Sequence, residues 1–133
     1  MEQPLIVTSA IIVNEKNELL LVKRAREPFK DYWGFIGGKG AFKFTKDPIE
    51  AVKIEVKGDI GCDFEPKFFT YNFENFGIPT LTLFYYGEIK GELRITERYI
   101  SEFKWFNPEE ANKVDLCFDN KKILKMWIEN KSH

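Results

Sequence analysis

The sequence has 133 residues, 44% of them hydrophobic and 13 of them phenylalanine, which predicts one packed globular domain over residues 1–133 rather than a disordered chain. The formal net charge is −1, so no overall basic field attracts nucleic acid. An anionic ligand must therefore be held by local lysines and arginines or by a metal ion.

Cysteine and histidine are scarce in this sequence. Cys62 and Cys117 are too few and too far apart for a disulfide framework or a zinc site, which favours a reducing compartment and no disulfide partner. The single histidine, His133, argues against a Ser–His or Cys–His nucleophile pair. The N-terminus lacks a basic signal-peptide segment and no apolar run approaches 18 residues, so we expect a cytoplasmic protein without a membrane partner.

Two apolar, β-branched runs open the chain, at residues 5–13 and 19–23. The turn residues 14–17 between them predict a β-hairpin. The second run ends in Lys23-Arg24-Ala25-Arg26. Charges at a strand end can simply discourage aggregation at a sheet edge, so these cations carry no functional signal by themselves.

A glycine pair and an aromatic run follow. Gly37 and Gly38 suit a sharp turn or a close approach of the backbone. Residues 39–46 alternate weakly and predict a short strand or an extended loop. Phe42 and Phe44 would share one face of it, and we expect core packing for them rather than stacking on a nucleobase.

The clearest helix signal begins at Asp47. This residue is a good N-cap, Pro48 suits the first turn, and Glu50 lies three residues after the cap, as in a capping box. Apolar residues recur at helical spacing and predict one buried face: Ile49, Val52, Val56 and Ile60. Gly58 and Gly61 weaken the helix and end it.

Two carboxylates of this helix are four residues apart. Glu55 and Asp59 should therefore project from one side, separated by roughly 6 Å along the axis. Two hard oxygen ligands at this spacing could bind Mg²⁺ or Mn²⁺, which bridge a few carboxylates to substrate phosphates. The same spacing is common among solvated carboxylates beside lysines, here Lys53 and Lys57, so spacing alone leaves both interpretations open.

The second half of the chain predicts further strands at residues 62–74, 80–89 and 101–106. Asn107 and Pro108 then open a short helix. The last helix begins near Asp119 and carries an apolar face made of Ile123, Leu124, Trp127 and Ile128.

Residues 33–62 resemble a Nudix box, whose signature is G-x5-E-x7-R-E-U-x-E-E-x-G-U, where U is apolar. The opening tryptophan and the glycine pair look like the strand and turn of the box, and Asp47 looks like the start of its helix. Aligned backwards from Gly61, Glu55 falls on the first Glu of the Arg-Glu pair and Asp59 on the second Glu of the Glu-Glu pair. The similarity extends over most of the chain, from Leu5 to about Ile128.

The box departs from the signature at three positions. Ile54 replaces the Arg, Lys46 replaces the first Glu, and Gly58 replaces the first Glu of the pair, where the family usually has a principal metal ligand. The loop before Glu55 also carries two extra residues. The box is therefore degenerate, and two functions stay open: an active hydrolase, or a catalytically impaired domain that binds a nucleotide or a protein partner.

The resemblance implies an α/β protein, a Nudix-type α/β/α sandwich with a mixed β-sheet between helices at residues 47–58 and 119–131. It implies a Mg²⁺- or Mn²⁺-dependent hydrolase that cleaves the pyrophosphate bond of a nucleoside diphosphate linked to another moiety. The partners that it implies are a nucleotide-type small molecule and, as is frequent in the family, a second copy of the chain in a homodimer.

The resemblance also implies roles for individual residues. The metal ligands would be Glu55, Asp59 and Glu50, the catalytic residues Glu55 and Glu97, and the substrate-binding residues Arg24, Arg26, Gly37, Gly38 and Lys39. For Glu97 the alternative is an exposed charge paired with a nearby cation. For Asp119 the resemblance suggests recognition of a nucleobase edge, and helix capping is the alternative.

Overall fold

The computed structural model describes residues 3–131, so His133 and both ends of the predicted 1–133 domain lie outside the described residues. The largest sheet has the order β4 (Ile36–Gly38), β1 (Leu5–Ile12), β7 (Pro79–Gly87) and β6 (Lys67–Asn75). A second sheet has the order β3 (Trp33–Gly34), β2 (Leu19–Arg24) and β9 (Ile100–Phe106). The short strands β5 (Asp63–Phe64) and β8 (Ile89–Lys90) pair with each other.

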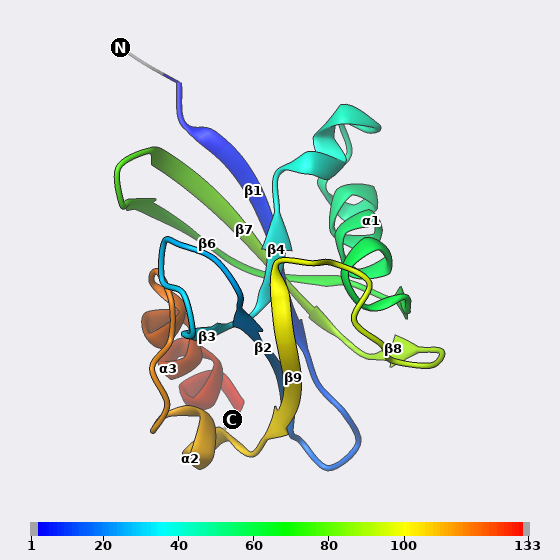
Figure 1. Ribbon diagram of the computed structural model, residues 1–133, viewed down its shortest axis with the longest axis vertical. Coiled ribbons are helices and arrows are strands. Elements are labelled where there is room, and N and C mark those ends of the chain that lie inside the picture. Colours follow the sequence, from blue (N-terminus) through cyan, green and yellow to red (C-terminus); the bar gives the residue numbers. More distant parts are fainter. Residues whose placement is uncertain (1–2, 132–133) are drawn as a thin grey trace.

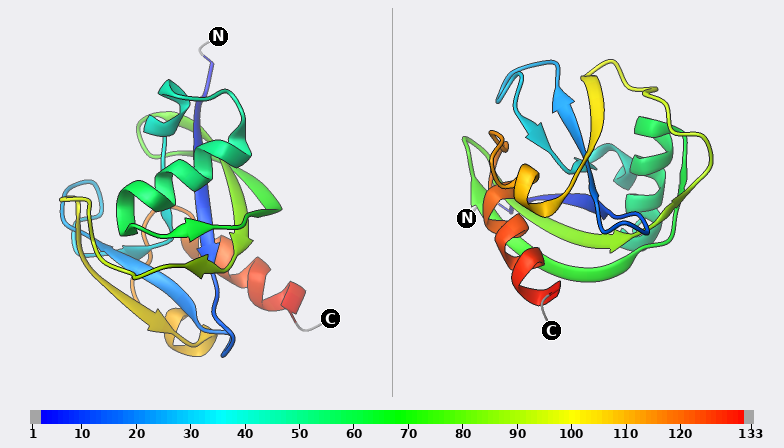
Figure 2. Two further views of the ribbon diagram at one scale, coloured as in Figure 1. Left: turned by 90° about the vertical axis from the view of Figure 1, so that its right-hand side faces the viewer. Right: turned by 90° about the horizontal axis from the view of Figure 1, so that it is seen from below.

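Helices lie on both sides of these sheets (Figures 1 and 2). The long helix α1 (Pro48–Ile60) covers one side, and α3 (Asn120–Lys131) covers the other together with the short α2 (Pro108–Ala111). The sheet is mixed, because β1 pairs in parallel with β7 and antiparallel with β4. The expected α/β/α sandwich with a mixed sheet is therefore confirmed. No helix among residues 3–131 has both the length and the apolarity needed to cross a bilayer.

Alternate residues of the central strands face two separate hydrophobic cores. In β1, Ala10 and Ile12 pack on the α1 side, whereas Ile11 packs on the α3 side. In β2, Leu20 and Leu21 divide in the same way. Successive side chains of a strand point to opposite faces, so a continuous apolar run is what a strand covered on both sides requires.

The predicted hairpin of residues 5–23 is right for the turn and wrong for the strand pairing. The Asn14 side chain accepts hydrogen bonds from the backbone N–H groups of Lys16 and Glu18, at 3.0 and 2.9 Å, and this closes the turn. Val13 and Leu19 then form an isolated bridge, after which β1 and β2 enter different sheets. Each strand finds longer partners elsewhere, β7 for β1 and β9 for β2.

The start of α1 confirms Asp47 as the N-cap, since its carboxylate accepts the backbone N–H of Ile49 at 2.9 Å. The capping box is not formed. Glu50 instead pairs with Lys53, with 3.5 Å between Oε1 and Nζ. Ile49 was expected in the core but is 45% exposed, and Ala51 takes its place on the buried face.

The end of α1 lies later than predicted, because the helix continues through Gly58 to Ile60. Gly61 ends it in the left-handed conformation, with φ 73°, and its N–H donates to the carbonyl of Lys57. A glycine inside a helix weakens it without breaking it when neighbouring residues pack well. Asp59 therefore lies inside the helix, one turn after Glu55.

Residues 39–46 are neither a strand nor an extended loop. They contain a 3-10 helix at Gly40–Lys43, and Phe44 is 77% exposed, so the expected core packing is wrong for that residue. The predicted strand 62–74 is also divided, into β5 and β6. Pro66 lies at the division, and proline cannot donate a ladder hydrogen bond.

Candidate functional site

A cavity of about 570 Å³ lies between α1, β4, the β6–β7 turn and the loops that follow β2 and precede α3. Most of the predicted site residues line it: Arg24, Arg26, Gly37, Gly38, Lys39, Glu55, Asp59 and Glu97. These residues come from segments up to about 70 positions apart in the sequence and meet because the sheets bring β2, β4 and the end of α1 together.

Glu55 is held against the glycine turn. Its Oε1 accepts the backbone N–H of Ala41 at 3.0 Å, which ties the 3-10 helix to α1. A Cβ atom at Gly38 would lie 2.5 Å from Oε2 of Glu55, so no other residue fits there without displacing this carboxylate. The close backbone approach predicted from Gly37 and Gly38 is confirmed at both positions: a Cβ atom at Gly37 would lie 2.8 Å from the carbonyl oxygen of Thr8, and the backbone of Gly38 lies against the Glu55 carboxylate.

The loop before β9 brings Glu97 to α1. The backbone N–H groups of Arg94 and Thr96 donate to the carbonyls of Ile60 and Asp59, at 3.1 and 2.9 Å. The last carbonyls of a helix have no partner within the helix, so they are available to fix a passing chain. The loop is thereby held along the end of α1, and Glu97 lies close enough to act electrostatically on Asp59.

Three carboxylates thus share one wall of the cavity. Burial and the negative charges of Glu55 and Glu97 raise the pKa of Asp59 from 3.8 to about 7. Mutual repulsion of this kind fits a site that receives a cation, because a cation would stabilise all three charges at once.

The donor set fits a divalent cation that is only partly coordinated by protein. Among residues 3–131, no group of three or more His, Cys, Asp or Glu side chains is arranged closely enough to hold a metal ion. Mg²⁺ usually binds through one or two carboxylates and completes its coordination with water and substrate phosphates. Glu55 and Asp59 suit that smaller role. A Cβ atom at Gly58 would meet no atom within 4 Å, so the space of the missing carboxylate is open.

Glu50 does not join these carboxylates. It precedes Glu55 by five residues, which places it about 140° away around the helix. Its side chain pairs with Lys53 and is absent from the cavity lining. The geometry therefore removes Glu50 from the ligand set implied by the family resemblance.

The three basic side chains predicted to bind substrate differ in how firmly the protein holds them. Arg24 Nε donates to the carbonyl of Pro28 at 2.7 Å, and its guanidinium lies 5.0 Å from the ring centroid of Phe118. Burial lowers the pKa of Arg24, although an arginine remains cationic at neutral pH. The guanidinium carbon of Arg26 lies 3.4 Å from the ring centroid of Tyr99, so the two groups stack. The Lys39 side chain is exposed to solvent. Within residues 3–131, the side-chain nitrogens of Arg26 and Lys39 form no hydrogen bond with the protein, unlike Nε of Arg24.

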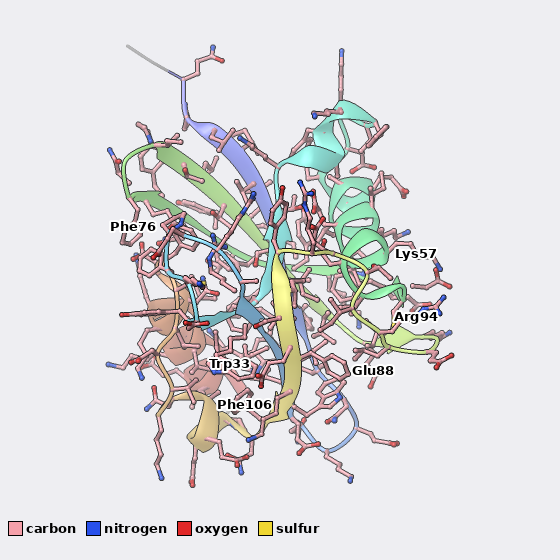
Figure 3. All side chains as sticks on the ribbon, in the orientation of Figure 1. Trp33, Lys57, Phe76, Glu88, Arg94 and Phe106 are labelled. Atoms are coloured by element: carbon pink, nitrogen blue, oxygen red, sulfur yellow. The ribbon has the colours of Figure 1, made fainter. Side chains whose placement is uncertain are left out.

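The far end of the cavity is aromatic, and sequence reasoning missed it. Phe29 lies at the centre of a ring cluster, 5.4 Å from Tyr32, 5.4 Å from Phe76 and 4.8 Å from Phe118. Figure 3 shows Phe76 on the opposite side of the molecule from Lys57 on α1. Phe76 and Phe118 line the cavity, as does Glu74 on β6. The available signal was the alternation of Asn72 and Glu74 with exposed aromatic residues along β6.

The segment before α3 is fixed to β3. Cys117 donates its backbone N–H to the carbonyl of Trp33 at 2.8 Å, and the Asn120 side chain accepts the N–H of Phe35 at 2.9 Å. Burial raises the pKa of Cys117 to about 11, so its thiol stays neutral and is a poor nucleophile. Asp119 is not part of the lining, and its carboxylate accepts a hydrogen bond from Asn72 at 2.8 Å.

The sequence profile of the NUDIX domain matches residues 4–127. The chain belongs to the Nudix family. Members of this family generally hydrolyse nucleoside diphosphates linked to other moieties and generally use divalent cations. The resemblance of residues 33–62 to a Nudix box is thus confirmed at the level of the family.

Solved Nudix structures agree with this fold. A MutT NUDIX hydrolase from Burkholderia pseudomallei is 26% identical with a TM-score of 0.80, and the match covers 93% of this chain and 98% of that one. The NUDIX domain of Shewanella oneidensis NrtR, crystallised with ADP ribose, is 17% identical with a TM-score of 0.86, covering 98% and 90%. A MutT protein from Methanosarcina mazei is 21% identical with a TM-score of 0.81, covering 100% and 99%. None of the curated proteins matches the sequence significantly.

Proposed function

We propose that this protein is a Mg²⁺- or Mn²⁺-dependent hydrolase that cleaves the pyrophosphate bond of a nucleoside diphosphate linked to another moiety. The observation that carries the proposal is the convergence of Glu55, Asp59 and Glu97 on one wall of the cavity, where burial and the two neighbouring charges together raise the pKa of Asp59. Three carboxylates of like charge are costly to keep together unless a cation or a proton joins them.

The residues of the site would divide the work by position. Glu55 and Asp59 would hold the cation, which supplies an activated water and shields the charge of the phosphates when it is bound. Glu97 reaches the same wall from a separate loop and would accept the proton of the attacking water. Arg26 and Lys39 would hold phosphate oxygens, and Arg24 would shape the pocket through its bond to the Pro28 carbonyl. Gly38 keeps Glu55 in position.

Other findings support the class of ligand and the setting. The Shewanella oneidensis domain, which has the same fold, was crystallised with ADP ribose, and this supports a nucleotide-type ligand for the present cavity. Both cysteines are buried with free thiols, which agrees with a reducing, cytoplasmic compartment. The homodimer implied by the family stays a prediction.

Gly58 favours a second function, a domain that binds a nucleotide without cleaving it. The family position usually supplies a metal ligand, and here no side chain occupies the space. With one carboxylate fewer the site would hold the cation more weakly. The protein would then bind a nucleotide without cleaving it. A protein partner for this form of the domain is also compatible with the loss of the ligand.

The two functions are separated by measuring the release of phosphate or nucleoside monophosphate. The substrates are nucleotide sugars, dinucleoside polyphosphates and nucleoside triphosphates, each with Mg²⁺ and with Mn²⁺. Asp59→Asn is the control, since it removes the charge and keeps the shape. Metal-dependent release that the control loses would establish the hydrolase. If folded protein releases nothing from any substrate, the binding function replaces it.

A further inference from the structure

Glu74 is a carboxylate that the proposed hydrolysis does not use. It lies near the end of β6, and its Oε1 accepts a hydrogen bond from the Thr82 hydroxyl at 3.3 Å. Its Oε2 is shielded from solvent and makes no hydrogen bond of full geometry with residues 3–131, although the backbone N–H of Asp119 is close enough to lower the pKa of the carboxylate. Glu74 also lines the cavity, and a carboxylate whose oxygens are not fully hydrogen-bonded within the protein can accept a further hydrogen bond there.

The surroundings of Glu74 separate it from the carboxylates on α1. Burial, followed by the charge of Asp119, raises the pKa of Glu74, and the Thr82 hydroxyl and the backbone N–H of Asp119 lower it by less. Glu74 lies on β6, at the opposite edge of the sheet from β4, against which α1 packs. Glu74 therefore belongs to a different end of the same cavity. Figure 1 shows the same separation, with α1 and the β6–β7 turn on opposite sides of β4.

The walls around Glu74 suit a flat ring. Phe76 and Phe118 line this end of the cavity, with ring centroids 5.6 Å apart, and Ile78 and Leu5 add apolar surface. Phe76 is 48% exposed, so part of its ring is open to contact. Stacking of a base on an aromatic side chain is worth about 1–3 kcal/mol but does not distinguish between bases. A carboxylate beside the stacking surface would supply that distinction, because it only accepts hydrogen bonds.

We propose that Glu74 is the specificity residue of this cavity: it accepts a hydrogen bond from the exocyclic amino group of a nucleobase packed against Phe76 and Phe118. The inference rests on the proposed function for the nucleotide class of the ligand. It predicts that the protein selects an amino-bearing purine over the same purine without that amino group.

Binding measured without divalent cations tests this inference independently of turnover. Two pairs of nucleoside 5′-monophosphates are titrated by calorimetry in EDTA: adenosine against purine riboside, and guanosine against inosine. Each pair differs by one amino group. A hydrogen bond to a charged acceptor contributes about 1.5–3 kcal/mol, so the amino-bearing member of one pair should bind roughly tenfold or more tightly.

Two variants assign the difference to Glu74. Glu74→Met keeps the length of the side chain without an acceptor, and it should bind both members of each pair equally. Glu102→Gln changes an exposed strand glutamate outside the cavity and should keep the wild-type ratio. Thermal unfolding checks that each variant is folded.

Several outcomes would overturn the inference: equal binding within both pairs by the wild type, an unchanged ratio in Glu74→Met, or no binding of any of the four nucleotides. Failure of the proposed hydrolysis is read separately, from the release experiment. A protein that discriminates by the amino group but releases no product would keep the role of Glu74 and lose the catalytic proposal.

Discussion

The two ends of the cavity are built in different ways. At the α1 end, Glu55 and Asp59 are one helical turn apart, and the third carboxylate is added by backbone hydrogen bonds to the end of the same helix. At the β6 end, the walls come from β6, from the loop after β2 and from the segment before α3. The first end carries residues that align with the Nudix box, and the second is built by residues outside that segment. Substitutions at one end can therefore be tested without changing the residues of the other.

The difference between the two ends of the cavity can first be tested by removing a charge at the α1 end. Glu55→Gln should lower kcat/KM by about 10²–10³-fold or more, because it removes the charge of a proposed metal ligand. Substitution of residues that only hydrogen-bond to metal ligands already costs about 10–100-fold. Affinity for nucleoside monophosphates in EDTA should change little. Glu50→Gln, on the same helix but off the cavity, is the matched control. Equal losses in the two variants would show that helix charge, rather than the cavity, matters.

The second test uses pH and metal removal to distinguish the buried carboxylates of the two ends. The pKa of folded Asp59 is about 7 against its ordinary 3.8, so its contribution to stability is present at low pH and is lost as the pH rises through about 7. In EDTA the melting temperature should therefore fall between about pH 4 and about pH 7, and Asp59→Asn should flatten that fall.

The pKa of Glu74 is raised as well, so its contribution has the same sign. Mg²⁺ should reduce the fall in melting temperature that is due to Asp59. It should leave unchanged the part of the fall that Glu74→Gln removes, because the proposed cation site includes Asp59 and not Glu74. A Mg²⁺ effect that disappears in Glu74→Gln instead would place the cation at the wrong end of the cavity.

A third test restores the missing carboxylate of the box. Gly58→Glu enters open space and adds a charge beside Asp59, so we expect the Mg²⁺ concentration for half-maximal turnover to fall by about tenfold. Gly58→Gln has the same size and no charge, and it should not lower that concentration. If both variants behave alike, the absence of a carboxylate at position 58 does not limit the proposed hydrolysis.

The smallest effect concerns the helix itself. Gly58→Ala should raise the free energy of unfolding by about 0.5–1 kcal/mol, because alanine loses less backbone entropy in a helix and a Cβ atom meets no neighbour here. Urea unfolding measures this change. Gly38→Ala is the contrasting variant, since its Cβ would press on Glu55, and it should lower both stability and turnover. A destabilised Gly58→Ala would mean that this part of α1 has another role.

Much of the fold could be predicted from local patterns. The cap at Asp47, the left-handed end at Gly61 and the double-sided burial of β1 and β2 depend on residue type and spacing over one or two turns or strands. The same short-range logic placed Glu55 and Asp59 on one side of a helix. This logic failed for the pairing of residues 5–23, because a local pattern does not tell whether β1 pairs with β2 or with β7.

The sequence by itself therefore determined the family, the elements and two carboxylates of the α1 end, because these follow from repeating local geometry. Only the tertiary structure decided that Glu97 reaches Asp59, that Glu50 faces away, and that Glu74 lies with Phe76 and Phe118 in one cavity. Those placements depend on which strands pair and on where the loops are anchored. Such contacts join residues far apart in the chain, and no spacing within a single element records them.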